Sequence, residues 1–164
     1  MPILLYRVDE RLIHGQVVVG WGSELRPDRY LVVDEDLARS EWEQELYLLG
    51  LPDGVTARFV SVDEARERLD EWRASADRSV LLTRDVETML KLARGGVLSG
   101  ERVNLGGIHH GPERSRVLSY LHLDAEDRDR LRKLRDEGVE VTARDLPGSP
   151  GVSLSSLLKG DGGR

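Results

Sequence analysis

Side chains capable of acid, base or nucleophilic chemistry crowd into one short stretch near the start of the chain. Residues 6–16, Tyr-Arg-Val-Asp-Glu-Arg-Leu-Ile-His-Gly-Gln, hold two arginines, two carboxylates and a histidine, directly after an apolar run at residues 3–5. Ligands of open α/β sheets gather at the carboxyl ends of strands, and the N–H groups at a helix start attract anions. Spacing alone leaves two interpretations equally open: an anion site around His14, or an ordinary loop histidine among solvated arginines.

Under the first interpretation, His14 is the nucleophile. Attack of an imidazole on a phosphoryl group needs a neutral ring nitrogen, and such transfers depend mainly on positioning and electrostatics. Arg11, three residues before His14, is the first candidate to bind the transferred oxygens, and its charge would disfavour an imidazolium. Arg7, at the strand end, is the second candidate, with contact to a partner protein as its other interpretation.

Asp9, Gly15 and Gln16 complete the predicted phosphate site. Asp9 is expected to orient the loop or to accept a hydrogen bond from the imidazole or from Arg11, which would fix the ring nitrogen that reacts. A plain turn residue is the alternative for Asp9. Backbone N–H groups of Gly15 and Gln16 would hold phosphate at a helix start, and the glycine permits close approach. No cofactor is expected.

The run Arg-Val-Asp-Glu-Arg-Leu-Ile-His-Gly-Gln-Val at residues 7–17 resembles the active-site signature of a known family. These are the IIB components of the mannose/fructose/sorbose family of the bacterial phosphoenolpyruvate-dependent sugar phosphotransferase system. Further similarity lies at residues 55–62, 86–97 and 104–107, and it is weakest after Ile108. The resemblance implies that a phosphorylated IIA protein phosphorylates His14 on Nδ1. It also implies that His14 passes the group to a sugar at a membrane permease of IIC and IID components.

Two other functions remain open. The first is a phosphorylatable regulatory or docking protein of the same fold, suggested by the atypical loop at residues 108–116. The second is an unrelated doubly wound enzyme with a nucleotide cofactor, which ranks low because neither a Gly-x-Gly-x-x-Gly turn nor a phosphate-loop lysine follows a strand. A carrier that meets two proteins in turn needs an accessible, partly apolar and cationic surface. Leu12 and Ile13 either supply its apolar part or lie buried beneath the loop.

Composition narrows the function classes. The 164 residues carry a formal net charge of −6, which argues against general affinity for nucleic acid or anionic membranes. The chain has no cysteine, so it has no disulfide or thiolate metal site, and the cytoplasm is the expected location. No segment approaches the roughly 20 apolar residues of a membrane span, and the first residues lack the features of a signal peptide. Direct membrane insertion is therefore not expected.

Strand and helix patterns alternate along the first two thirds of the chain, which predicts an open, mainly parallel twisted sheet with helices on both faces. Strands are expected at residues 3–8, 30–33, 56–60, 80–83 and 102–105. Helices are expected at residues 16–25, 61–72 and 86–93, with another after a cap at Asp34 or Asp36. That helix is expected to bury Ala38, Trp42, Leu46 and Leu49.

The regular alternation of strand and helix patterns ends after Gly107. Residues 114–119 and 120–123 are expected to form a short antiparallel ribbon at the sheet edge, followed by a charged helix at 124–138 and a strand at 139–143. A last helical turn is expected near Leu154. We predict one phosphocarrier domain over residues 1–159 and a frayed tail at 160–164.

Other polar residues are expected around the same crevice. Thr83 and Arg84 are candidates for contact with phosphate or sugar, but a structural role is favoured for these strand-end residues, because Asp34 and Asp85 are equally good helix caps. Three histidines, His109, His110 and His122, suggest a metal site at first sight. Adjacent histidines on a strand point to opposite faces, however, and no helical spacing joins them, so no metal site is predicted. The roles of these three histidines are left open.

Overall fold

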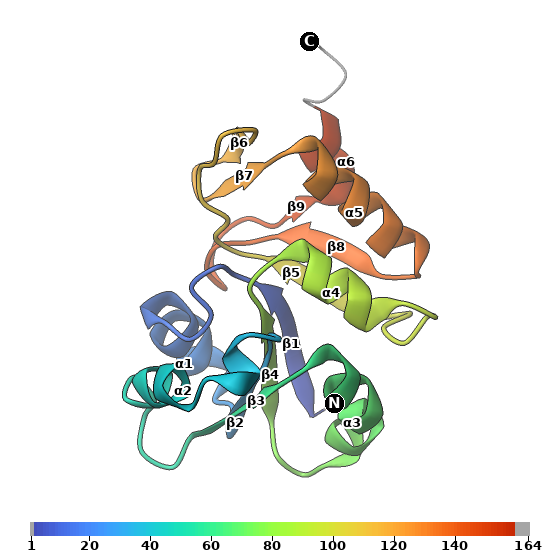
Figure 1. The fold of residues 1–164 in the computed structure, drawn as a ribbon. Coiled ribbons are helices and arrows are strands. Elements are labelled where there is room, and N and C mark those ends of the chain that lie inside the picture. Colours follow the sequence, from blue (N-terminus) through green and yellow to red (C-terminus); the bar gives the residue numbers. More distant parts are fainter. Residues whose placement is uncertain (1, 160–164) are drawn as a thin grey trace.

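Seven strands form one twisted sheet, in the order β3-β2-β4-β1-β5-β8-β9 (Figure 1). The computed structural model describes residues 2–159, so the predicted tail at 160–164 lies outside the described residues. The strands of the sheet are β1 (Ile3–Val8), β2 (Arg29–Val33), β3 (Thr56–Val60), β4 (Ser79–Thr83), β5 (Arg102–Leu105), β8 (Glu140–Ala143) and β9 (Val152–Ser153). The first six strands of that order are parallel, and β9 runs antiparallel to β8.

The order of the strands places a crevice at the carboxyl end of β1. The chain leaves β1 towards β2 on one side, whereas β4 and β5, its two neighbours, lead to the other side. Loops that diverge in this way leave an opening between them, and open α/β sheets bind their ligands there. The loop that carries His14 follows β1 directly.

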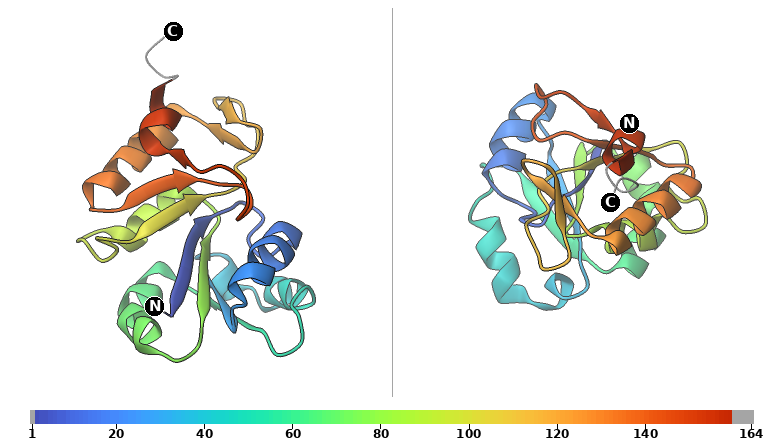
Figure 2. Two further views of the ribbon diagram at one scale, coloured as in Figure 1. Left: turned by 180° about the vertical axis from the view of Figure 1, so that it is seen from behind. Right: turned by 90° about the horizontal axis from the view of Figure 1, so that it is seen from above.

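Helices cover both faces of the sheet, as predicted. One face carries η1 (Gln16–Trp21), α1 (Gly22–Leu25), η2 (Leu37–Arg39) and α2 (Glu41–Leu48). The other carries α3 (Val62–Ala74), α4 (Val86–Ala93) and α5 (Ala125–Asp136), while α6 (Leu154–Leu158) contacts β8 and β9 (Figure 2). No helix in the described part of the chain is long and apolar enough to cross a bilayer.

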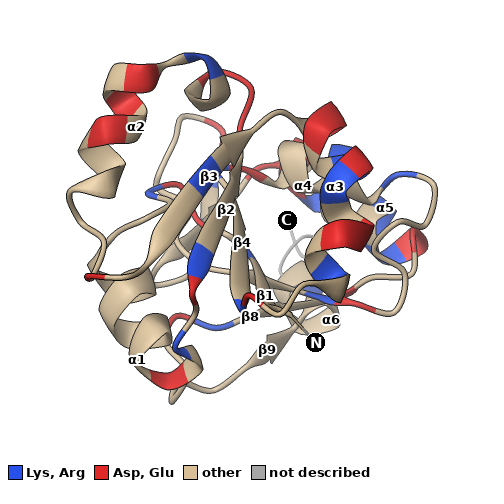
Figure 3. Cartoon of the chain, turned by 90° about the horizontal axis from the view of Figure 1, so that it is seen from below, with Lys and Arg blue, Asp and Glu red and all other residues tan. Residues whose placement is uncertain are grey.

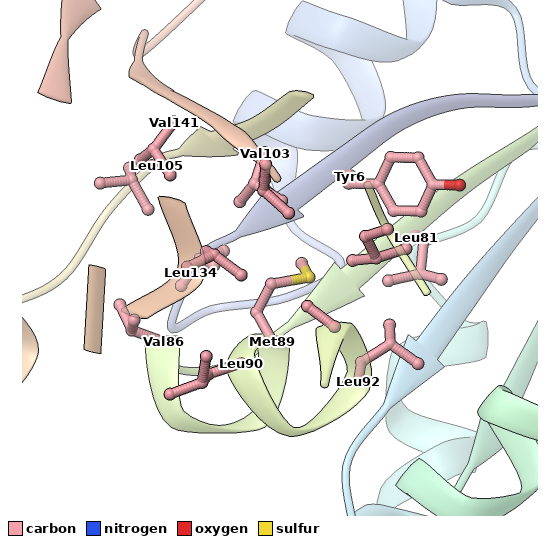
Figure 4. Close-up of a cluster of buried hydrophobic side chains, with 14 of the residues drawn as sticks. Tyr6, Leu81, Val86, Met89, Leu90, Leu92, Val103, Leu105, Leu134 and Val141 are labelled. Carbon is pink, nitrogen blue, oxygen red and sulfur yellow. The ribbon is translucent and has the colours of Figure 1, made fainter. Parts of the chain in front are cut away.

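Two apolar cores lie on the two faces of the sheet. The larger joins β1, β4 and β5 to α3, α4 and α5, and Figure 4 shows Leu81, Met89 and Leu134 among its side chains. The smaller includes Leu12, Val17 and Leu82. Every residue of β4 is buried, because the strand lies between β2 and β1 in the sheet and helices cover both faces.

The predicted helix at residues 16–25 is present, but its first part winds as a π-helix, η1, and only its last four residues as α1. Two glycines let this segment pack closely. A Cβ atom on Gly20 would lie 2.6 Å from the Leu146 side chain, and one on Gly22 would lie 3.0 Å from the Tyr30 hydroxyl. Short π-helical turns occur often beside functional sites.

The predicted buried stripe on the second helix is wrong. Trp42, Leu46 and Leu49 are 65%, 58% and 82% exposed, and Ala38 is only partly buried. The helix α2 packs on the smaller core through Tyr47 instead. Helical spacing identifies an apolar face of a helix, but it does not show whether the same chain covers that face.

The C-terminal third contains the predicted strands and helices, but the antiparallel ribbon is not at the edge of the main sheet. Strands β6 (Ser115–Leu118) and β7 (Leu121–Leu123) form the antiparallel ribbon, but as a separate two-stranded sheet. The antiparallel edge of the main sheet is β9. Helix α5 begins with a capping box between Asp124 and Asp127. Local hydrogen bonding therefore fixes this helix start, whereas the place of the ribbon depends on long-range packing.

Stability is expected to fall at alkaline pH because two phenols are buried. Burial raises the pKa of Tyr6 to about 12, against the opposing effect of Arg73, and burial also raises the pKa of Tyr30 to about 12. The folded state therefore favours the neutral phenols. This contribution is complete below the unfolded pKa of about 10 and is lost between about pH 10 and pH 12, by up to roughly 3 kcal/mol for each phenol.

Urea unfolding across that interval, with the ultraviolet absorbance of tyrosinate followed in parallel, measures this loss. Tyr30→Phe removes one of the two titrating groups and should roughly halve the pH dependence. An unchanged slope in that variant would contradict the assignment to Tyr30.

Candidate functional site

An ion pair between Arg7 and Asp9 lies beneath the loop that follows β1. Both side chains have zero exposure, and Arg7 Nη2 lies 3.1 Å from Asp9 Oδ2. Every N–H group of the Arg7 guanidinium has an acceptor: the carboxylate of Asp9, the side-chain oxygen of Asn104, and the carbonyl oxygens of Arg144 and Asp145. The expectation that Arg7 binds phosphate or faces a partner is therefore wrong, because it has neither a spare donor nor an exposed surface.

The buried guanidinium of Arg7 also packs over an aromatic ring. Its Cζ lies 5.2 Å from the centre of the Trp21 ring, a cation–π contact. Burial lowers the pKa of Arg7, and the neighbouring Asp9 carboxylate opposes that shift. Arg7 therefore links β1, η1, β5 and the loop after β8 into one support for the site. Sequence analysis did not predict that Asn104, Arg144 and Asp145 are partners of Arg7. Only Asn104 could have been suspected, because it is a polar residue within a strand, shortly before Gly-Gly.

Asp9 connects this buried support to the loop above it. Its carboxylate accepts hydrogen bonds from the backbone N–H groups of Arg11, at 3.2 Å, and Gly107, at 3.3 Å. Its Oδ2 atom lies 3.8 Å from His14 Nε2. The Asp9 carboxylate thus contacts the loop backbone on one side and faces the imidazole on the other.

Gly106 leaves the space that the ion pair occupies. A Cβ atom built on Gly106 would overlap the Arg7 guanidinium and would lie 2.6 Å from Asp9 Oδ2. Only glycine fits at such a distance. The Asn-Leu-Gly-Gly motif at residues 104–107 therefore supplies both an acceptor for Arg7 and the gap that admits it.

Gly106→Ala is expected to destabilise the protein by about 1–3 kcal/mol, because the added methyl group must displace the Arg7–Asp9 pair. Chemical denaturation measures this change. Gly148→Ala is the matched control, since a Cβ atom there would meet nothing within 4 Å. Equal stability of the two variants would show that the Arg7–Asp9 pair moves aside without cost.

Leu12 and Ile13 are buried beneath the loop, which decides between their two interpretations. Leu12 has zero exposure and Ile13 only 7%. Leu12 adopts a left-handed backbone conformation, with φ of 56°. That conformation costs a branched residue about 1–3 kcal/mol, and here the buried side chain anchors it. The turn at Leu12 therefore fixes the direction in which the side chain of His14, two residues later, projects from the backbone.

His14 lies between two oxygen atoms. Its Nδ1 is 2.9 Å from the Leu12 carbonyl oxygen, and its Nε2 faces Asp9 without a hydrogen-bond partner in the described part of the chain. A carbonyl oxygen only accepts, so Nδ1 carries a proton in this arrangement. The side chain is 13% exposed. The nitrogen that the family resemblance implies as the phosphorylated atom is thus occupied by a hydrogen bond.

Arg11, Gly15 and Gln16 flank His14 in the sequence, and Arg11 and Gly15 are exposed. Arg11 Nη2 donates to Gln16 Oε1 at 3.1 Å. The carbonyl of His14 accepts from the backbone of the first helical turn. Gly15 is exposed, and a Cβ atom there would meet nothing within 4 Å. Arg11 is therefore the exposed cation three residues before His14, and Gly15 has no side chain that would block a partner from approaching the loop.

The remaining polar residues at the strand ends have mainly structural partners. Asp34 caps η2 through Leu37 N–H, and Asp85 caps α4 through Thr88 N–H. Thr83 is buried and donates to the carbonyl of Asp85, so its predicted contact with phosphate or sugar is wrong. Arg84 is 42% exposed and pairs with Asp34 at 3.1 Å.

Glu10 fastens the loop after β5 to the loop after β1, which sequence reasoning missed. Its carboxylate accepts from the backbone N–H of His109 at 3.0 Å and from Arg114 Nη1 at 3.1 Å, and its Oε2 lies 2.6 Å from His109 Nδ1. Arg114 in turn contacts Asp127. The rings of His110 and His122 pack edge to face, 5.9 Å apart. Within residues 2–159, no group of three or more His, Asp or Glu side chains is arranged to hold a metal ion.

Comparison with known proteins gives one consistent result. Residues 3–162 match the family described as "PTS system sorbose subfamily IIB component". The N-acetylgalactosamine-specific phosphotransferase enzyme IIB component 2 of Escherichia coli (strain K12) is 32% identical over 161 residues, which cover 96% of this chain and 100% of the relative. The fructose-specific EIIB component of Bacillus subtilis (strain 168) is 29% identical, over 97% of each chain. The IIBSor domain of the sorbose permease from Klebsiella pneumoniae has a TM-score of 0.84 and 26% identity, over 96% of each chain.

Proposed function

The chain belongs to the sorbose subfamily of IIB components of the phosphotransferase system, and from that premise we propose that His14 is the residue that carries its phosphoryl group. IIB components of this system are phosphotransferases that take a phosphoryl group from IIA and deliver it to a sugar at the permease. The observation that carries the proposal is the position of His14. It is the partly exposed imidazole at the carboxyl end of the central strand, held between Asp9 and the Leu12 carbonyl.

The first transfer begins when His14 Nδ1 gives up its hydrogen bond to Leu12. A rotation of the ring breaks that bond, Nδ1 loses its proton to water, and Nε2 takes a proton from water, so that Nε2–H points to Asp9. The freed lone pair on Nδ1 then attacks phosphorus. An N–P bond forms on His14 as the N–P bond of the phosphorylated IIA histidine breaks, and its electron pair returns to the IIA ring.

In the second transfer His14 is the phosphoryl donor. A sugar hydroxyl oxygen attacks phosphorus as the N–P bond of His14 breaks, the electron pair of that bond returns to Nδ1, and the hydroxyl proton passes to water. In both transfers Arg11 and the N–H groups of Gly15 and Gln16 bind the phosphoryl oxygens, which is the role that charge and exposure favour for them. The family resemblance supports Nδ1 as the reacting atom.

Arg7 and Asp9 act as positioning residues in this proposal. Asp9 accepts a hydrogen bond from Nε2–H and so directs Nδ1 outwards, and Arg7 keeps the buried carboxylate in place. The 3.8 Å between Asp9 Oδ2 and His14 Nε2 would shorten in the phosphorylated form. Asp9 would thereby stabilise the charge that the ring acquires.

The partners follow from the same proposal. They are a phosphorylated IIA protein, the IIC and IID components of a permease, and a sugar, and the carrier works in the cytoplasm as one domain over residues 1–159. The atypical loop that suggested a regulatory function is tied to the site by Glu10. It therefore gives that alternative no support.

Mass spectrometry of the intact chain after incubation with a phosphorylated IIA donor tests the proposal. One phosphoryl group, labile in acid and stable in base, should appear on His14, and nitrogen NMR should assign it to Nδ1. Failure of cognate IIA proteins to label His14 would refute the proposal. A label on Nε2 would refute only the assignment of the atom.

A further inference from the structure

The helix α2 presents an apolar face that the chain itself does not cover. Four of the five large hydrophobic residues that are exposed in the described part of the chain lie on α2 or directly after it: Trp42, Leu46, Leu48 and Leu49. Trp42, Leu46 and Leu49 recur at helical spacing on one side of α2, whereas Leu48 lies on another side, and we call Trp42, Leu46 and Leu49 the α2 face. Isolated exposed apolar residues are ordinary, but a contiguous group of this kind marks an interaction surface.

This surface extends to the loop that carries the predicted phosphorylation site. A cavity of about 420 Å³ lies between α2 and the loop after β1. It is lined by Ile13, Trp42, Glu43, Leu46, Tyr47, Gly50 and Arg84. Ile13 immediately precedes His14, so the cavity beside α2 reaches the loop that carries His14.

The charges around the α2 face are negative. Glu41, Glu43 and Glu45 lie on α2, which carries no lysine or arginine (Figure 3). Arg39, just before α2, pairs with Asp36, and Arg84, which lines the cavity, pairs with Asp34. A partner that fits this surface must therefore combine apolar side chains with positive charge.

We propose that the α2 face docks the cytoplasmic loops of the permease, an inference that rests on the proposed carrier function. Cytoplasmic loops of membrane proteins carry an excess of lysine and arginine, which complements the acidic rim of α2. The anionic lipid surface beside those loops repels the same rim. The face therefore directs the carrier to the permease protein and away from the lipid around it.

The test measures the two transfers separately with the intact chain. The first is labelling of His14 by phosphorylated IIA in solution, and the second is sugar phosphorylation by inverted membrane vesicles that contain the permease. Trp42→Ala should raise the carrier concentration needed for half-maximal sugar phosphorylation about tenfold or more, as loss of an aromatic anchor does. Glu45→Lys should raise it too, and salt should weaken binding of the unaltered chain. Labelling by IIA should remain as in the unaltered chain.

Glu126→Lys on α5 is the matched control, because it makes the same change of charge on the opposite face of the sheet at a 78% exposed side chain. It should leave both transfers unchanged. Trp42 is exposed, so circular dichroism should show an intact fold in its variant.

Slowed labelling by IIA with normal sugar phosphorylation would overturn the proposal in favour of IIA as the occupant. If both transfers are unchanged in the variants, the proposal is also overturned. If Trp42→Ala leaves both transfers unchanged but abolishes self-association in sedimentation, a second copy of the chain is the occupant of the α2 face. An unlabelled His14 in the unaltered chain is a separate result, which would refute the carrier function and this inference with it.

Discussion

His14→Ala is expected to abolish phosphoryl transfer to sugar while leaving the fold intact. The variant lacks the imidazole of the only histidine in the loop after β1, so no ring nitrogen remains there to form the N–P bond. Removal of the group that accepts the phosphoryl group in the first transfer and releases it in the second should lower the rate by about four orders of magnitude or more. The measurement is sugar phosphate formed in the presence of IIA and permease vesicles, together with the phosphoryl content of the carrier.

His109→Ala is the matched control for that variant. It removes another imidazole from the same end of the sheet, one that is 61% exposed and bound to Glu10. Since His109 is not the acceptor in the proposed mechanism, its variant should still take up one phosphoryl group from IIA. If His14→Ala takes up a phosphoryl group from IIA and His109→Ala does not, the phosphorylation site lies in the loop after β5 instead.

Arg7→Met is expected to have the largest effect on stability, a loss of about 3–5 kcal/mol. The substitution leaves the Asp9 carboxylate buried without its charged partner and removes the hydrogen bonds that tie β1 to the carbonyl groups of Arg144 and Asp145. Urea or thermal unfolding measures the loss. His14 labelling by IIA should also slow, because Asp9 positions the imidazole.

Two further variants separate the buried ion pair from simple loss of charge. Arg102→Met breaks the Arg102–Glu140 pair, whose side chains are 64% and 60% exposed, and such exposed pairs contribute at most about 1 kcal/mol. Arg7→Met combined with Asp9→Asn removes both buried charges, so it should be less destabilised than the sum of the single variants. Similar losses for Arg7→Met and Arg102→Met would contradict the structural role assigned to the buried pair.

Features governed by neighbouring residues were predicted well from the sequence. The alternation of apolar runs with helical patterns predicted the parallel sheet. The caps at Ser61, Asp85 and Asp124 follow from side chains that bond to backbone groups three residues away. The run at residues 7–17 indicated the family, and the comparisons with known proteins confirm that membership. Each of these signals is local, so the order of residues alone carries it.

The roles of the arginines depended on the tertiary structure. Arg7 and Arg11 look alike in the sequence, yet Arg7 is wholly buried and Arg11 is exposed. The reason is that partners of Arg7 lie 97 to 138 positions further along the chain. Only the folded sheet brings these partners to the end of β1, and no pattern of spacing records such a distance.

The sequence by itself determined the family, the order of strands and helices, and the loop in which His14 lies, because each follows from residues that are close together in the chain. The tertiary structure decided which charges are buried, which nitrogen of His14 is occupied, and that the apolar side of α2 faces outwards. Those properties depend on what packs against each side chain from distant segments. Burial and hydrogen bonding are set by that packing, and the residue type alone does not specify it.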